Sequence, residues 1–308
     1  MTRSPRESSR VAQPRPLRSD ARDGPGNGRE GGDFLEQMAA CSHERVRAAR
    51  AACPESELLR RALATAAPPA LRLTPGGFDL IAEMKLRSPA VGQLKGGGED
   101  LAARVTRYAR AGASAVSVLT EPSRFDGSLE HLRATAEALR PLGVPAMRKD
   151  FLVDPYQVIE ARACGAGGVL VILRMLSDAA AMSLLGCARE LSLFALIETF
   201  DERDIERLHG LVSTLGRTGL LAGVNCRDLA TLQVVPGRLE ALAPLLPDSI
   251  PRVAESGVGS AEDARRLAQA GYDLALVGSA LMRDSDPTAL AQAMLRAARS
   301  ARSGGECA

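Results

Sequence analysis

The chain has 308 residues, of which 45% are hydrophobic, 25% are charged and 3% are aromatic, and its formal net charge is +2. This composition is typical of a globular protein. It argues against a nucleic-acid partner, which needs a cationic surface and aromatic rings that stack on bases. No apolar run is long enough to cross a membrane, so no membrane partner is expected either.

The cysteines indicate a reduced protein. Six are present, no two of them form a C-x-x-C pair, and only three histidines accompany them. Since the N-terminus also lacks the apolar segment of a secretion signal, we expect free thiols, no metal site and a cytoplasmic location. The six are Cys41, Cys53, Cys164, Cys187, Cys226 and Cys307.

Residues 1–33 are rich in Arg, Pro, Ser and Gly and nearly free of large apolar side chains. Such a segment buries too little surface to offset its ordering entropy, so we expect a disordered tail ahead of a catalytic domain at residues 34–303. Acidic residues among the arginines favour a solvated tail over a nucleic-acid-binding one. These acids are Glu7, Asp20, Asp23 and Glu30.

The segment from Phe34 to Ala67 carries Leu, Met, Val and Ala at helical spacing. Pro54 interrupts the pattern, and Pro68 and Pro69 end it. We therefore expect one or two helices as an N-terminal extension of the domain.

After this extension, eight short apolar runs alternate with amphipathic stretches at intervals of roughly 20–35 residues. The number and spacing of these units predict an α/β fold, a (β/α)8 TIM barrel. The expected strands are 79–84, 115–119, 144–147, 168–172, 194–197, 220–224, 252–254 and 274–277. The expected helices include 99–111, 155–164, 178–190, 201–208 and 261–270. A doubly wound open sheet is the alternative, but it usually shows a G-x-G-x-x-G turn after its first strand, and residues 85–89 read Lys-Leu-Arg-Ser-Pro.

Polar residues at the carboxyl ends of the expected strands form the candidate active site, because (β/α)8 barrels place their active sites there. Glu83 and Lys85 lie two residues apart in the first strand and its end, so they point to the same face. Lys149 ends the third strand and Glu198 follows the fifth. Burying charge without use is costly, so a functional role is favoured over a structural ion pair.

Asn225 and Arg227 follow the sixth strand and face the same mouth. Two lysines, two glutamates and an arginine brought together should have pKa values that are driven apart. The two lysines should also lower each other's pKa by like-charge repulsion. Asp150 is expected either to orient Lys149 or to cap the helix that opens at Pro155.

The last two strand–helix units predict an anion site. Ser256-Gly257 follows the seventh strand and Gly278-Ser279 follows the eighth. Barrels frequently bind phosphate with these two loops, where small residues let backbone N–H groups approach the anion.

At these residues the chain resembles the indole-3-glycerol-phosphate synthase family, over about residues 35–300. Each fragment is weak alone, but their order and placement at strand ends are specific. The fragments are Ile81-Ala82-Glu83-Met84-Lys85, Ser88-Pro89, Ser117–Glu121, Phe125-x-Gly-Ser-Leu129, Lys149-Asp150-Phe151, Asp154-x-Tyr156-Gln157, Asn225-x-Arg227-Asp228-Leu229, Ala254–Gly257 and Val277-Gly278-Ser279-x-Leu281-Met282.

The resemblance implies conversion of 1-(o-carboxyphenylamino)-1-deoxyribulose 5-phosphate into indole-3-glycerol phosphate with loss of CO₂ and water. It implies neither a metal nor an organic cofactor. Lys149 would be the general acid of ring closure, Glu198 the base of the dehydration, Lys85 its acid partner, and Glu83 would orient both lysines. The residues implied to line the substrate are Ser88, Phe151, Asn225 and Arg227, and those implied to hold its phosphate are Ser256, Gly257, Gly278 and Ser279.

The sequence departs from the family pattern after the first strand. The usual Ser-Pro-Ser-x-Gly reads Ser88-Pro89-Ala90-Val91-Gly92, and three glycines follow at 96–98. This loop shapes closure over the site, so rate or substrate range could differ, and a specialised indole pathway is a second setting beside tryptophan biosynthesis. Cys226, between Asn225 and Arg227, is interpreted as a packing residue.

Two other functions compete with this one. A phosphoribosyl isomerase would carry an Asp pair or a Cys/Asp pair at strand ends, whereas the tips here carry glutamates and lysines. A non-catalytic barrel subunit would have lost at least one strand-end acid or base, and none is missing. We expect a small phosphorylated substrate as partner and a monomer or weak homo-oligomer.

Overall fold

The computed structural model describes residues 34–85, 87–88, 92–93, 100–228, 231 and 233–303. The expected tail at residues 1–33, the glycines at 96–98 and Cys307 lie outside the described residues.

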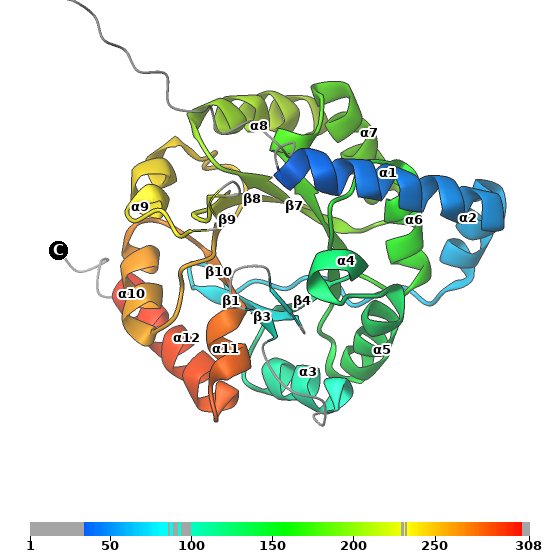
Figure 1. Ribbon diagram of the computed structural model, residues 1–308. Helices are drawn as coiled ribbons and strands as arrows, with labels where there is room; N and C mark the ends of the chain where they lie inside the picture. Colours follow the sequence, from blue (N-terminus) through cyan, green and yellow to red (C-terminus); the bar gives the residue numbers. More distant parts are fainter. Residues whose placement is uncertain are drawn as a thin grey trace, which may run out of the picture. The chain divides into compact units, whose positions relative to one another are not determined.

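Eight parallel strands close into a barrel, which confirms the predicted (β/α)8 fold (Figure 1). The strands are, in their order around the barrel, β1 (Asp79–Met84), β10 (Leu274–Val277), β9 (Arg252–Glu255), β8 (Leu220–Asn225), β7 (Phe194–Thr199), β6 (Gly168–Ile172), β5 (Ala146–Lys149) and β4 (Ala115–Leu119). Parallel pairing of β1 with both β4 and β10 joins the two ends of the sheet.

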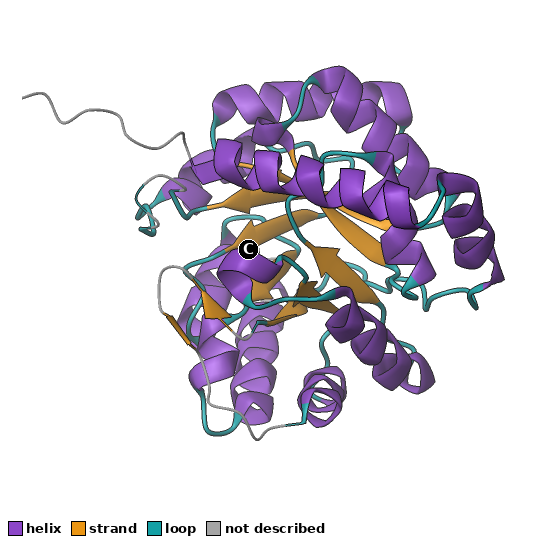
Figure 2. Cartoon of the chain, turned by 45° about the vertical axis from the view of Figure 1, so that its right-hand side comes forward, coloured by secondary structure: helices purple, strands orange, loops and turns teal. Residues whose placement is uncertain are grey.

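Helices surround the barrel on its outside (Figures 1 and 2). Most follow a strand directly, and an Asp or Ser side chain accepts a backbone N–H at the start of several of them, which satisfies a donor that the helix itself leaves unpaired. The helices are α3 (Leu101–Arg110), α4 (Pro122–Phe125), α5 (Leu129–Leu139), α6 (Pro155–Ala163), α7 (Asp178–Glu190), α8 (Glu202–Leu215), α9 (Arg238–Leu242), α10 (Ala261–Gln269), α11 (Ser279–Arg283) and α12 (Pro287–Ser303), with short 3₁₀ turns η1 (Arg140–Leu142), η2 (Leu173–Met175) and η3 (Ala243–Leu245).

The strands differ from the expectation in places. A small antiparallel hairpin, β2 (Arg87–Ser88) with β3 (Gly92–Gln93), follows β1. The third barrel strand begins at Ala146 and not at Val144, since Pro145 has no N–H to donate to a neighbouring strand.

The N-terminal extension consists of two helices, α1 (Phe34–Ala52) and α2 (Glu55–Ala64), separated at Pro54 as the sequence indicates. Leu35 and Met38 of α1 pack into the apolar cluster that fills the barrel interior. The extension therefore forms part of the wall at the mouth of the barrel.

Side chains inside the barrel follow the two-residue period of the strands. Apolar residues such as Ile81, Met147, Leu196 and Val253 fill the interior. The residue two positions further along each of these strands points to the same side, nearer to the carboxyl end. This geometry places Glu83, Lys149, Glu198 and Glu255 above the apolar layer.

Candidate active site

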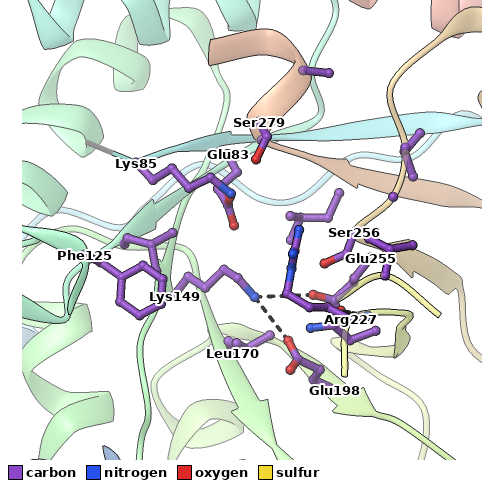
Figure 3. A pocket seen from close by; sticks show the side chains of 18 of the residues that line it. Glu83, Lys85, Phe125, Lys149, Leu170, Glu198, Arg227, Glu255, Ser256 and Ser279 are labelled. Carbon is purple, nitrogen blue, oxygen red and sulfur yellow. Dashed lines mark hydrogen bonds and ion pairs between the residues drawn. The ribbon is translucent and has the colours of Figure 1, made fainter. Parts of the chain in front are cut away.

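A cavity of about 350 Å³ opens at the carboxyl ends of the strands. It is bordered by strand ends and by the loops that follow β8, β9 and β10 (Figure 3). The predicted site residues that line it are Glu83, Lys85, Lys149, Phe151, Glu198, Asn225, Arg227, Ser256, Gly257, Gly278 and Ser279. Ser88 lies in β2, and its side chain is outside the described part of the chain.

Lys149 lies between two buried carboxylates. Its Nζ is 3.1 Å from Oε2 of Glu198 and 3.5 Å from Oε2 of Glu255. The lysine side chain is 15% exposed and the two carboxylates are 2% and 1% exposed, so solvent screens these charges little. Lys149 is therefore a buried cation that still reaches the cavity.

A second ion pair joins Lys85 Nζ to Oε1 of Glu83, with both side chains largely buried. It confirms the expectation that these two side chains share a face. Figure 3 shows Lys85 and Lys149 approaching the same cavity from different strands. Two lysine side chains therefore face the same cavity.

The carboxylates raise the pKa of Lys149. Burial lowers this pKa, but the negative charges of Glu198, Glu255 and Glu83 together outweigh burial. The expectation that like-charge repulsion lowers the pKa of Lys149 was wrong, because the lysine has more carboxylate than ammonium neighbours. Lys149 is consequently a proton-bearing cation at neutral pH.

The carboxyl groups have pKa values driven apart, as expected for a crowded site. Burial raises the pKa of Glu83, but Lys85, Lys149 and Arg227 outweigh it, so the net shift is downward. Burial and then the charge of Glu198 raise the pKa of Glu255 well above its usual range. The site thus combines an ionised carboxylate with one that holds a proton readily.

Glu255 is a buried carboxylate of the site that sequence reasoning missed. It follows Ala254 in a fragment that we interpreted only as an anion loop, although the two-residue alternation from Val253 places it inside the barrel. Space for it comes from β8, since a Cβ on Gly223 would collide with Oε1 of Glu255. That oxygen is buried and has no hydrogen-bond partner among the described residues.

The cavity wall contains Phe151, whose ring contacts Phe34 with centroids 5.8 Å apart and Phe125 with centroids 6.0 Å apart. Asn225 is buried, and its Oδ1 accepts a hydrogen bond from the backbone N–H of Arg227 at 2.9 Å. The cavity is therefore lined by aromatic rings as well as by polar side chains.

Asp150 neither pairs directly with the Lys149 ammonium nor caps α6. Its carboxylate binds Arg45 and Arg148 and accepts from Thr120, so it does not contact the Lys149 ammonium in the described structure. The cap of α6 is Asp154, whose side chain accepts from the N–H of Tyr156.

The two predicted phosphate loops lie together at one side of the cavity. Ser256 and Gly257 have positive φ angles of 67° and 69°, which turn the chain sharply after β9. A Cβ on Gly278 would collide with Glu83 Oε1 and lie 3.0 Å from Lys85 Nζ, so this glycine also makes room for the acid–base pair. Arg283 lines the same cavity and adds a positive charge that the sequence reasoning had not included.

Metal ligands and membrane spans were sought among the described residues. There, no three His, Cys, Asp or Glu side chains converge as metal ligands, and no helix has the length and apolarity to span a membrane. Cys226 is buried, and burial raises the pKa of its thiol, which disfavours the reactive thiolate and fits a packing role.

Acidic and basic side chains gather at the carboxyl end of a closed parallel barrel, where such barrels place their active sites, and this defines the class: a (β/α)8-barrel enzyme. The chain belongs to the indole-3-glycerol phosphate synthase family, whose profile matches residues 35–294. That membership decides against an isomerase and against a non-catalytic subunit.

The relatives support this assignment. The chain is 44% identical over 232 residues to an indole-3-glycerol phosphate synthase from Nocardioides sp., covering 74% of this chain and 85% of that one. It is 40% identical over 245 residues to the enzyme of the same name from Mycobacterium leprae, covering 79% and 86%.

Solved structures support the fold alone. A 3-hexulose-6-phosphate synthase from Salmonella typhimurium matches with a TM-score of 0.56 at 15% identity, over 73% of this chain and 100% of that one. A thiamine phosphate pyrophosphorylase from Pyrococcus furiosus matches with a TM-score of 0.52 at 16% identity, over 73% and 96%.

Proposed function

We propose that the chain closes the indole ring of 1-(o-carboxyphenylamino)-1-deoxyribulose 5-phosphate and releases indole-3-glycerol phosphate, CO₂ and water. It acts in the biosynthesis of tryptophan or of a specialised indole. The observation that carries the proposal is the Lys149 ammonium held between Glu198 and Glu255 at the base of the cavity.

Lys149 acts as the general acid of ring closure. As the anthranilate ring carbon attacks the ketose carbonyl, a C–C bond forms and the carbonyl oxygen takes the proton of Lys149. Its raised pKa keeps the lysine charged before the reaction, and the positive charge stabilises the developing oxyanion. Loss of CO₂ from the same ring carbon then restores the aromatic ring.

Dehydration uses the remaining acid–base groups. Glu198 removes a proton from the ring-closed intermediate, and Lys85 donates one to the departing hydroxyl group. Glu83 orients Lys85 through their ion pair and also lowers the positive potential around both lysines. Lys85 contacts the carboxylate of the substrate before CO₂ leaves.

The substrate is held at both ends. Its phosphate binds backbone N–H groups and hydroxyls of the loops that contain Ser256-Gly257 and Gly278-Ser279, where Arg283 adds charge. Phe151 packs on the anthranilate ring, and Ser88, Asn225 and Arg227 contact the sugar and the carboxylate.

The catalytic domain spans residues 34–303, it uses no metal and no organic cofactor, and catalysis does not need residues 1–33. The enzyme works in the cytoplasm as a monomer or weak homo-oligomer. Deleting residues 1–33 should leave both the melting temperature and kcat unchanged, as differential scanning fluorimetry and steady-state kinetics would show.

One assay tests the function directly. The purified chain is mixed with the anilino-ribulose phosphate, and formation of the indole product is followed by its fluorescence. Turnover by the wild type that disappears in Lys149→Met supports the proposal. A folded wild type that leaves the substrate unchanged would overturn it.

A further inference from the structure

The segment 149–151 lines the cavity with the ammonium of Lys149 and the ring of Phe151. Asp150 lies between these two residues in the chain. Alternation along the chain turns Arg148 and Asp150 away from the barrel interior. The reacting lysine is therefore flanked on both sides by charged residues that face the surrounding helices.

Asp150 is the centre of a buried polar network. Arg45 of α1 donates to both of its oxygens, Nη1 to Oδ2 at 2.9 Å and Nη2 to Oδ1 at 2.7 Å. Thr120 Oγ1 and Arg148 Nη2 donate to Oδ2 at 2.6 Å and 3.0 Å. Oδ1 also accepts the backbone N–H of Phe151 at 2.8 Å. A single carboxylate thus joins the end of β5, the residue that follows the neighbouring strand β4, and helix α1 of the extension.

The same elements hold the backbone on either side of Asp150. The N–H of Thr120 donates to the carbonyl of Lys149 at 3.1 Å. Ser42 of α1 donates its hydroxyl to the carbonyl of Phe151 at 2.5 Å and accepts from Gln157 at 2.8 Å. The position of the lysine and of the ring wall therefore depends on α1.

Without Arg45 this network carries excess negative charge, since the buried Glu121 also acts electrostatically on Arg45 beside Asp150 and Glu160. Arg148 bridges Asp150 and Glu160, each at 3.0 Å, and one arginine cannot neutralise two carboxylates. Arg45 supplies the second positive charge, and the Asp150 carboxylate that it binds is fully buried. Removing that charge leaves a buried carboxylate undercompensated, which is costly enough to shift the backbone that carries it.

We propose that Arg45 is a positioning residue for the reaction, which by neutralising Asp150 places the general acid Lys149 and the ring wall Phe151. The inference rests on the proposed function of Lys149. It assigns a part in catalysis to a side chain of the N-terminal extension that does not line the main cavity.

The chain offers a matched control on the same helix. Arg50 also ties α1 to the segment after β5, through a 2.7 Å ion pair with Asp154, but Asp154 caps α6 and contacts neither Lys149 nor Phe151. Arg45→Met and Arg50→Met each remove one such ion pair and keep most of the aliphatic stem. Only the first removes charge from the Asp150 network.

The experiment measures kcat, KM and melting temperature for the wild type and for both variants, well below the lowest melting temperature. A displacement of about 1 Å at a reacting group can cost up to roughly 100-fold in rate, so kcat of Arg45→Met should fall by about 10- to 100-fold, more than KM rises. Arg50→Met should keep the wild-type kcat. Equal kcat values for the two variants would overturn the inference.

Two further variants separate positioning from simple loss of structure. Glu160→Gln added to Arg45→Met restores charge balance around Arg148, so the double variant should recover part of the lost kcat. Arg45→Lys keeps the charge without the two-pronged hydrogen bond and should give an intermediate kcat. If Arg45→Met does not fold, the likewise uncharged Arg45→Gln replaces it, and a wild-type kcat in Arg45→Gln overturns the inference, as does a double variant no faster than the single uncharged variant.

Failure of the function and failure of the inference give different results. A wild type without turnover contradicts the proposed reaction itself. An active wild type whose kcat is insensitive to Arg45 contradicts only the positioning role.

Discussion

Gly223 of β8 lies directly beside Glu255 of β9, so closely that a methyl group on the glycine would collide with the Oε1 atom of the carboxylate. A side chain is therefore absent at one strand position because a functional side chain of the next strand occupies that volume. Gly278 and Glu83 repeat this relationship at the joint between β10 and β1.

Gly223→Ala should reduce kcat by tenfold or more, since Glu255 would have to leave its place beside Lys149 and overpacking of this kind costs about 1–3 kcal/mol. Gly210→Ala is a suitable control, because a Cβ there meets no atom within 4 Å. Steady-state kinetics and thermal unfolding of both variants check this. A Gly223→Ala enzyme with unchanged kcat would show that Glu255 does not need its present position.

Lys149→Met should lower kcat by roughly 10²- to 10⁴-fold, the usual effect of losing a positioned general acid. The structure adds a consequence for stability. Without the ammonium, Glu198 and Glu255 face each other without a cation, so the pKa of Glu255, already raised by burial and by Glu198, rises further in the folded protein. The melting temperature of the variant should then increase, relative to that of the wild type, as the pH is lowered from 8 towards 5. A pH-independent difference would argue against the predicted repulsion.

Glu255→Gln should stabilise the protein at alkaline pH at the expense of activity. The folded-state pKa of Glu255 is raised, so its ionisation opposes folding. That penalty is absent below the ordinary carboxyl range, grows as the pH rises towards the raised pKa, and is constant beyond it. The difference in melting temperature between variant and wild type should therefore be small near pH 4 and larger at pH 8. The opposite trend would mean that Lys149 stabilises the Glu255 carboxylate more than burial destabilises it.

Ser279→Asp places a negative charge in the predicted phosphate site and should raise KM at least tenfold with a smaller change in kcat. Inorganic phosphate should also compete with the substrate in the wild type and lose this effect in the variant. Ser213→Asp, on the outer helix α8 and far along the chain from either phosphate loop, is the charge-matched control. Unchanged KM in Ser279→Asp, together with no competition by phosphate, would contradict the site. Gly278→Val is a poorer probe, because it would also displace Glu83.

Much of the barrel could be predicted, because its strands are short apolar runs that polar or turn-forming residues bound in the sequence. The bounds of β1, β4, β6 and β10 agree with the sequence analysis, as do those of α7. Helix α8 extends to Leu215, beyond the predicted end at residue 208, since its apolar face continues through Leu208 and Leu211. Local patterns place elements well but do not specify the contacts between distant ones.

For the candidate active site, too, local patterns could be read from the sequence and contacts between distant residues could not. The strand-end residues Glu83, Lys85, Lys149 and Glu198 could be located from their positions after apolar runs, and all four line the cavity. The role of Asp150 could not be predicted, because its partner Arg45 lies 105 residues away in sequence. The direction of the Lys149 pKa shift was wrong for a related reason: Glu198, Glu255 and Glu83 together outweigh burial, and their convergence on one ammonium is a contact between distant parts of the chain.

Closure of the barrel sets when the active site can exist during synthesis of the chain. Glu83 and Lys85 lie at the end of the first strand, but the space that holds them is bounded by Gly278, directly after the last one. While β10 is still inside the ribosome, every proton-transfer residue of the nascent chain has already been translated. The segment that packs against Glu83 is still missing at that stage. Because the pairing of β1 with β10 joins the two ends of the sheet, catalytic competence should arise in one late step and not accumulate strand by strand.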